Sequence, residues 1–106
     1  MAADVVQLDR PAVFEELSVQ AERGDGAAAW RLGLMYRNGI AVAQDKARAA
    51  YWLEMAAQRG VAAAMFTLSN MLSEGEGVAM DRMAARRWLE TAAEREYPEA
   101  LQQLAL

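Results

Sequence analysis

The sequence of 106 residues contains neither cysteine nor histidine. The lack of cysteine excludes disulfides and thiolate metal sites, and it leaves the redox compartment unspecified. The lack of histidine removes the commonest general base, the commonest neutral metal ligand and every histidine-dependent nucleophilic pair. We therefore expect a protein that is not an enzyme and that holds no cofactor or metal.

Long apolar runs and an excess of basic charge are also missing. No stretch of about 18 consecutive apolar residues could span a membrane, and the opening "MAADVVQLDRP" lacks the basic and apolar segments of a signal peptide. With 11 basic and 15 acidic residues, the formal net charge is −4. These features predict a cytoplasmic protein that binds neither membrane nor nucleic acid, and they favour a basic partner.

What the chain does contain is a repeated phrase. The segment "AAYWLEMAAQRG" at 49–60 returns as "AARRWLETAAERE" at 84–96, and a shift of 36 residues brings many identical residues into register. This number of identities exceeds what alanine richness alone would produce, so the chain is a helical-repeat candidate. The register divides its single domain into a half repeat at 6–23, full repeats at 24–59 and 60–95, and a half repeat at 96–106.

Within each repeat the apolar residues return every three or four positions, which is the period of an α-helix, and no segment alternates with period two. We predict six helices, at 11–23, 26–38, 46–58, 62–74, 82–95 and 98–105. Glycines suit the left-handed ends of two helices, aspartates suit amino-terminal caps, and prolines suit first turns. The residues in these roles are Gly39 and Gly75, then Asp9, Asp45 and Asp81, then Pro11 and Pro98.

Small residues recur where helices must approach closely, and larger ones recur where a gap needs filling. Each helix pair then leaves an apolar face open for its neighbour. The sequence pattern recurs because each repeat uses the same stacking surface. The small residues are Ala28, Gly33 and Ala49 in one unit and Ala64, Ser69 and Ala85 in the next; the large ones are Tyr36, Trp52, Leu72 and Trp88.

The segment "GDGAAAWRLGLMYRNGIAVAQDKARAAYWLEMAAQRG" resembles the Sel-one-like repeat (SLR), a branch of the tetratricopeptide superfamily. The matching positions are Ala28, Leu32-Gly33, Tyr36, Gly39, Val42, Asp45, Ala49, Trp52-Leu53, Ala56-Ala57 and Gly60. Ala41, Ser69, Leu72 and Glu96 depart from the pattern, which suggests local adjustment rather than another fold. The resemblance implies an all-α fold, an α-solenoid of antiparallel helix pairs in a right-handed superhelical stack.

The resemblance also implies a function in binding. Proteins with such repeats resemble adaptors and scaffolds, and some bacterial ones resemble immunity proteins that neutralise a cognate effector. The first helix of each pair would line a concave groove that binds a protein or peptide. The residues predicted to contact this partner are Trp30, Leu34, Arg37, Asn38, Phe66, Asn70, Ser73, Glu74, Glu99 and Gln102.

The sequence leaves two questions open. Trp30 and Phe66 could anchor a partner or pack between successive repeats, and both roles are compatible if one ring edge is exposed. The alternative function is that of a structural or assembly subunit that interacts through its solenoid ends. The carboxyl-terminal edge, with Leu101, Leu104 and Leu106, could pair two copies, so we expect a monomer or a weak homodimer.

Overall fold

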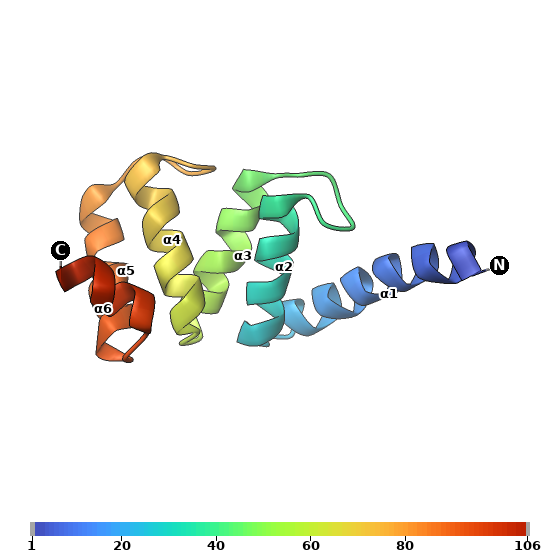
Figure 1. Cartoon of the computed structure of the whole chain (residues 1–106), viewed down its shortest axis with the longest axis horizontal. Coiled ribbons are helices and arrows are strands. Elements are labelled where there is room, and N and C mark those ends of the chain that lie inside the picture. Colours follow the sequence, from blue (N-terminus) through green and yellow to red (C-terminus); the bar gives the residue numbers. More distant parts are fainter. Residues whose placement is uncertain (1, 106) are drawn as a thin grey trace.

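The computed structural model describes the backbone of residues 2–105 and the side chains of residues 12–105. Helices are the only regular elements in this described part of the chain (Figure 1). Their bounds are α1 Ala2–Glu22, α2 Gly26–Asn38, α3 Lys46–Gln58, α4 Ala62–Glu74, α5 Arg82–Glu94 and α6 Pro98–Ala105. The predicted all-α class is therefore correct, and four of the six predicted helices have the observed bounds.

Each helix packs against the helices immediately before and after it in the chain. The result is an elongated antiparallel stack with extents of 51 × 24 × 23 Å (Figure 1). In such a zigzag, α2, α4 and α6 form one face, which we call the A face, and α1, α3 and α5 form the opposite B face. The predicted α-solenoid is confirmed, and it is built without a disulfide because the chain has no cysteine.

The helix ends follow the predicted turn chemistry. Gly39 and Gly75 have φ of 69° and 71°, and their N–H groups donate to the carbonyl groups of Met35 and Met71. The carboxylate of Asp45 accepts a hydrogen bond from the N–H of Arg48 at 3.0 Å, and that of Asp81 accepts one from the N–H of Ala84 at 2.9 Å. Each such cap stabilises its helix by about 1 kcal/mol.

One cap was not predicted. The carboxylate of Asp25 accepts a hydrogen bond from the N–H of Ala28 at 3.1 Å, so Asp25 caps α2. The equivalent residue before α4 is Val61, which makes no side-chain cap. Its side chain instead packs against the core. Asp25 therefore has no counterpart one period later, and a search for recurring residues passes over it.

The predictions for the amino-terminal end were wrong. Helix α1 begins at Ala2 rather than at residue 11, so Pro11 lies in the helix interior and Asp9 cannot be an amino-terminal cap. The physical reason is that Asp45 and Asp81 follow reversals of the chain, whereas no helix precedes α1 in the described residues. Its first half continues outward from the stack (Figure 1). The side chains of Asp9 and Pro11 lie outside those described. Two carboxyl-terminal bounds also differ by one residue, because α1 ends at Glu22 rather than at residue 23 and α5 ends at Glu94 rather than at residue 95.

The core consists mainly of alanine and leucine, with methionine in the second repeat. Close approach depends on Gly33, where an added Cβ would lie 2.8 Å from Cγ of Leu53 and 3.3 Å from the carbonyl oxygen of Ala49. The predicted small residues are all buried, and the predicted large ones are half-buried against this core. Interhelical spacing is thus set by the absence of side chains at particular positions.

Among the residues that the structure describes, no helix combines the length and the hydropathy that a membrane crossing requires.

Candidate functional site

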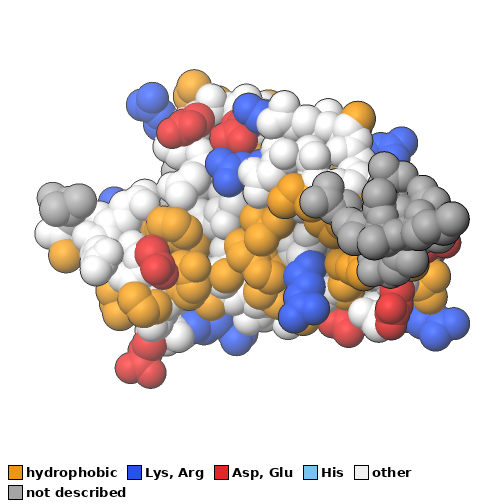
Figure 2. All heavy atoms as spheres, turned by 45° about the vertical axis from the view of Figure 1, so that its right-hand side comes forward, with side chains coloured by type: hydrophobic (Ala, Val, Ile, Leu, Met, Phe, Trp, Pro, Cys, Tyr) orange, Lys and Arg blue, Asp and Glu red, His pale blue; other side chains and the backbone are white. Residues whose placement is uncertain are grey.

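The residues predicted to bind a partner all come from the helices of the A face. Trp30, Leu34, Arg37 and Asn38 lie on α2, Phe66, Asn70, Ser73 and Glu74 on α4, and Glu99 and Gln102 on α6. Asn38 and Glu74, the last residues of α2 and α4, are exposed, and so are Glu99 and Gln102 on α6. The other six residues are half-buried. Figure 2 shows one face of the molecule, where hydrophobic side chains form a band with charged side chains around it.

Trp30 and Phe66 are each partly buried between repeats and partly exposed on the surface. Both side chains pack against the core and both keep part of their surface exposed. The ring of Phe66 also contacts that of Tyr97, with centroids 5.5 Å apart and planes inclined at 42°. Burial raises the pKa of Tyr97, and the neighbouring Glu99 acts in the same direction. Tyr97 therefore remains a neutral part of this surface at physiological pH.

Arg37 is held by an ion pair that the sequence did not reveal. Its Nε lies 3.0 Å from Oε1 of Glu76, which belongs to the turn after α4, and Lys46 Nζ lies 3.7 Å from the same oxygen. Hydrogen bonding from Arg37 lowers the pKa of Glu76, although desolvation opposes this effect. Arg37 keeps 33% of its side chain exposed. It is thus oriented by the second repeat while it remains accessible to a partner.

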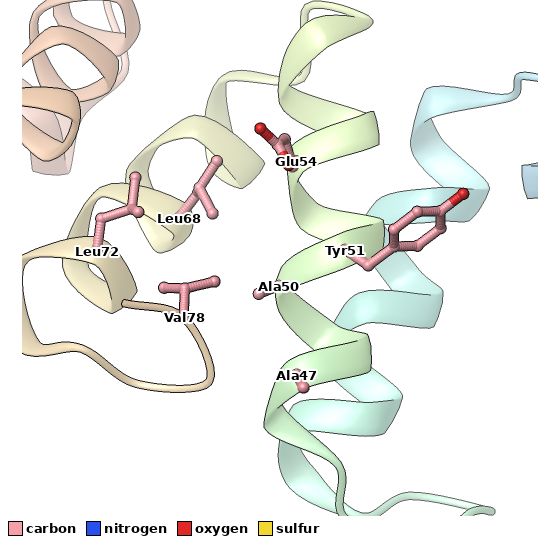
Figure 3. A pocket seen from close by; sticks show the side chains of 7 residues that line it. All are labelled: Ala47, Ala50, Tyr51, Glu54, Leu68, Leu72 and Val78. Atoms are coloured by element: carbon pink, nitrogen blue, oxygen red, sulfur yellow. The ribbon is translucent and has the colours of Figure 1, made fainter. Parts of the chain in front are cut away.

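A pocket that was not predicted lies between α3 and α4 (Figure 3). Its floor is apolar and includes Leu68, Leu72 and Val78, while the side chains of Tyr51 and Glu54 are exposed at its rim. The volume is about 260 Å³. The remaining lining residues are Ala47 and Ala50.

This pocket and the predicted binding residues are on opposite faces. Leu68 follows Phe66 by two positions on α4, and two helical positions correspond to a rotation of about 200°. Leu72 has the same relation to Asn70. The pocket therefore opens on the B face, beside the exposed side of α3. Sequence periodicity identifies such residues only as apolar, so it could not distinguish a pocket from filled core.

In the described part of the chain, no three Asp or Glu side chains are grouped in a way that could hold a metal ion. Glu54 and Glu90, which are equivalent in the two repeats, lie on different helices and are both exposed. Glu90 forms an ion pair with Arg86, with Oε2 3.6 Å from Nε.

Comparison with known protein families places both full repeats in one family. The family described as Sel1 repeat matches residues 26–61 and 62–97, which together are more than half of the chain. The two matched units begin two residues later than the predicted repeats at 24–59 and 60–95. The length of the repeat is the same, and only the residue chosen as its start differs.

Solved structures with the same fold extend this result. The chain is 37% identical to a Sel1 repeat protein from Oxalobacter formigenes, with a TM-score of 0.81 over 84% of this chain and 26% of that one. It is also 37% identical to a protective antigen of uropathogenic Escherichia coli with an SLR fold, with a TM-score of 0.78 over 82% of this chain and 19% of that one. This chain thus spans about a quarter or less of the length of those two proteins.

A third structure is closer in size. Cysteine-rich protein B of Helicobacter pylori is 26% identical, with a TM-score of 0.80 over 84% of this chain and 67% of that one. The present chain, without any cysteine, reaches the same fold by packing alone. A comparison with curated proteins found no match.

Proposed function

Because the chain belongs to the Sel1 repeat family, we propose that it binds a peptide or protein segment on its A face. Sel1 repeat proteins are protein-interaction modules. The observation that supports this site is the pair of half-exposed aromatic rings at equivalent positions, Trp30 and Phe66, next to polar side chains. Partly exposed aromatic residues beside charged groups are the usual anchors of protein interfaces.

The charge of the chain supports a finer proposal about the partner. With a net charge of −4, the protein attracts basic partners and accelerates their association. We propose that it acts without catalysis, in the cytoplasm, as an adaptor or as an inhibitor that covers a basic effector. The association rate with such a partner should fall steeply as salt concentration rises, which stopped-flow fluorescence of the tryptophans can measure.

The first test of the A face is an affinity capture from lysate of the source cell. The double variant Leu34→Glu with Asn70→Arg changes both middle repeats of the A face without changing net charge. Circular dichroism should show that it remains helical. We expect the wild-type protein to retain a specific partner and the double variant to lose it.

A matched control variant introduces the same two charged residues, one glutamate and one arginine, on the B face. Gln20 on α1 and Gln58 on α3 are exposed, so Gln20→Arg with Gln58→Glu should leave partner capture intact. If the A-face variant retains the same partner, the A face is not the binding surface. If only the control loses the partner, the functional surface is the B face.

A further inference from the structure

Helices α1 and α6 are equivalent to the two different halves of a repeat. In the register of 36 residues, α1 corresponds to the B-face helices α3 and α5, and α6 corresponds to the A-face helices α2 and α4. Within a repeat an A-face helix packs against the B-face helix that follows it, as α2 does against α3 and α4 against α5. Because α6 and α1 lie at opposite ends of the stack (Figure 1), they can form such a pair only between two copies of the chain.

The A-face helix and the B-face helix of the first repeat meet closely at Gly33. A Cβ added there would lie 2.8 Å from Cγ of Leu53 and 3.3 Å from the carbonyl oxygen of Ala49. Ala29 lies one helical turn before Gly33 on the same side of α2. All four residues are buried. These are the positions through which the two helices of a repeat contact each other.

The equivalent positions of α6 and α1 carry larger apolar side chains, and these are exposed. Leu101 stands at the position of Ala29 and has 48% of its surface exposed. Val13 stands at the position of Ala49 and has 50% of its surface exposed. Met65, the other equivalent of Leu101, is buried in the second repeat. A large apolar side chain at this position is thus compatible with the contact inside a repeat.

Arginines at the ends of two B-face helices lie over turns of the preceding repeat. A Cβ added at Gly24, in the turn between α1 and α2, would lie 2.8 Å from Nη1 of Arg59. A Cβ added at Gly60, in the turn between α3 and α4, would lie 3.3 Å from Nη1 of Arg95. Each arginine follows its own helix directly, so the same contact occurs twice, one period apart.

The register places an opposite charge at each half of this contact in α1 and α6. Arg23 is the equivalent of Arg59, and Glu96 is the equivalent of Gly60. Glu96 has a φ of 62°, in the left-handed region that favours glycine, and its side chain is exposed. Neither Arg23 nor Glu96 forms an ion pair with another side chain of residues 12–105. In a stack continued across two copies, the guanidinium of Arg23 would meet the carboxylate of Glu96.

We propose that α6 of one copy packs against α1 of a second copy and completes a further repeat. Leu101 and Val13 become buried in this junction, and Arg23 of the second copy pairs with Glu96 of the first. The two contacting surfaces differ, so the contact is heterologous, and every assembly keeps one α1 and one α6 for a further copy. The inference does not depend on the function proposed for the A face.

The junction should be weaker than the contact inside a repeat. Helix α6 has 8 residues, compared with 13 in α2 and in α4, so it buries less surface. On α1, Glu16 and Gln20 stand at the positions of Trp52 and Ala56. Burying these polar side chains costs part of the free energy that the apolar contact supplies. We therefore expect reversible association that begins with a dimer and dissociates on dilution.

Two variants test the junction by blocking one of its surfaces each. Val13→Lys places a charge on the surface of α1, and Leu101→Lys places one on the surface of α6. Both positions are exposed, so circular dichroism should show the helicity of the wild-type chain. In sedimentation velocity the wild-type mass should rise with concentration, whereas each variant alone should stay monomeric. An equimolar mixture of the two variants should form a dimer and nothing larger, because each pair keeps one intact α6 and one intact α1.

The ion pair is tested by exchanging its charges. Arg23→Glu and Glu96→Arg should each weaken association by roughly threefold or more, as expected when an exposed ion pair is replaced by like charges. The double variant has the net charge of the wild-type chain and should restore its association constant. Glu54→Arg changes the net charge as Glu96→Arg does, but it lies on the exposed side of α3 and should leave association unchanged.

Four results would overturn the proposal. Association of Val13→Lys alone would mean that two copies of α6 pair with each other, and association of Leu101→Lys alone would mean the same for α1. A wild-type chain or an equimolar mixture that stays monomeric would show that α6 does not bind α1. A double charge variant as weak as the single ones would show that Arg23 and Glu96 do not meet. Partner capture by the A-face variant is a separate measurement, so the two proposals stand or fall independently.

Discussion

Gly77, in the turn before α5, is the residue whose identity the structure constrains most tightly. Its φ is 74°, and a Cβ at this position would collide with the carbonyl oxygen of Lys46 at the start of α3. The equivalent residue in the first repeat is Ala41, which is exposed and also has a positive φ, of 66°. The left-handed conformation is thus required at both positions, but close backbone contact is shown for Gly77.

This difference predicts unequal effects of two single substitutions. Gly77→Ala should lower the free energy of unfolding by about 1–3 kcal/mol, because it adds both strain and a clash. Ala41→Gly should leave it unchanged or raise it by up to about 1 kcal/mol, because relief of the positive φ offsets the added freedom of the unfolded chain. Urea unfolding monitored by circular dichroism measures both. Equal effects of the two substitutions would contradict the structural assignment.

The residues at helix ends show which single positions a repeat reveals. Asp45 and Asp81 were predicted as caps because they recur in register, and both were confirmed. Asp25 was missed because Val61 stands one period later and packs against the core instead of capping. A recurring residue is visible in the sequence, whereas a capping residue used once is hidden among ordinary polar positions.

At the scale of elements, the bounds of α2, α3 and α4 follow from periodicity and turn chemistry, because each of these helices is delimited by a chain reversal on both sides. Helix α1 was misplaced for lack of that constraint. The contact between Arg37 and Glu76 joins α2 to the turn after α4, across 39 residues of chain. The sequence does not predict that these two residues form an ion pair, because pairing over such separations depends on how the repeats stack.

The Glu76 ion pair should make stability depend on pH. Because Arg37 lowers the pKa of Glu76 from its ordinary value of 4.5, the pair stabilises the fold above that value and is lost as pH falls through the depressed pKa. Between about pH 6 and pH 3, wild-type protein should lose about 0.5–1 kcal/mol more stability than Glu76→Gln. Thermal unfolding of both proteins across this range tests the prediction. Parallel pH profiles would show that the pair contributes nothing.

For the whole molecule, α6 carries apolar side chains that are exposed or half-buried. Leu101 on α6 has 48% of its surface exposed, and Leu104 is half-buried, while Leu106 lies outside the described residues. We expect a weak homodimer through this edge, visible as a mass that rises with concentration in light scattering. Leu101→Lys should return the mass to that of a monomer. A constant monomeric mass of the wild-type chain would remove the dimer from consideration.

The sequence by itself determined the class of fold, the length of the repeat and the inner helices, because apolar spacing, glycines and caps act locally and recur in register. It also restricted the candidate A-face residues to particular helix positions. Only the tertiary structure decided that Trp30 and Phe66 are half-exposed, that Glu76 holds Arg37, and that Ala50 and Leu72 leave a pocket. The physical reason is that exposure and empty volume depend on how neighbouring repeats fit together.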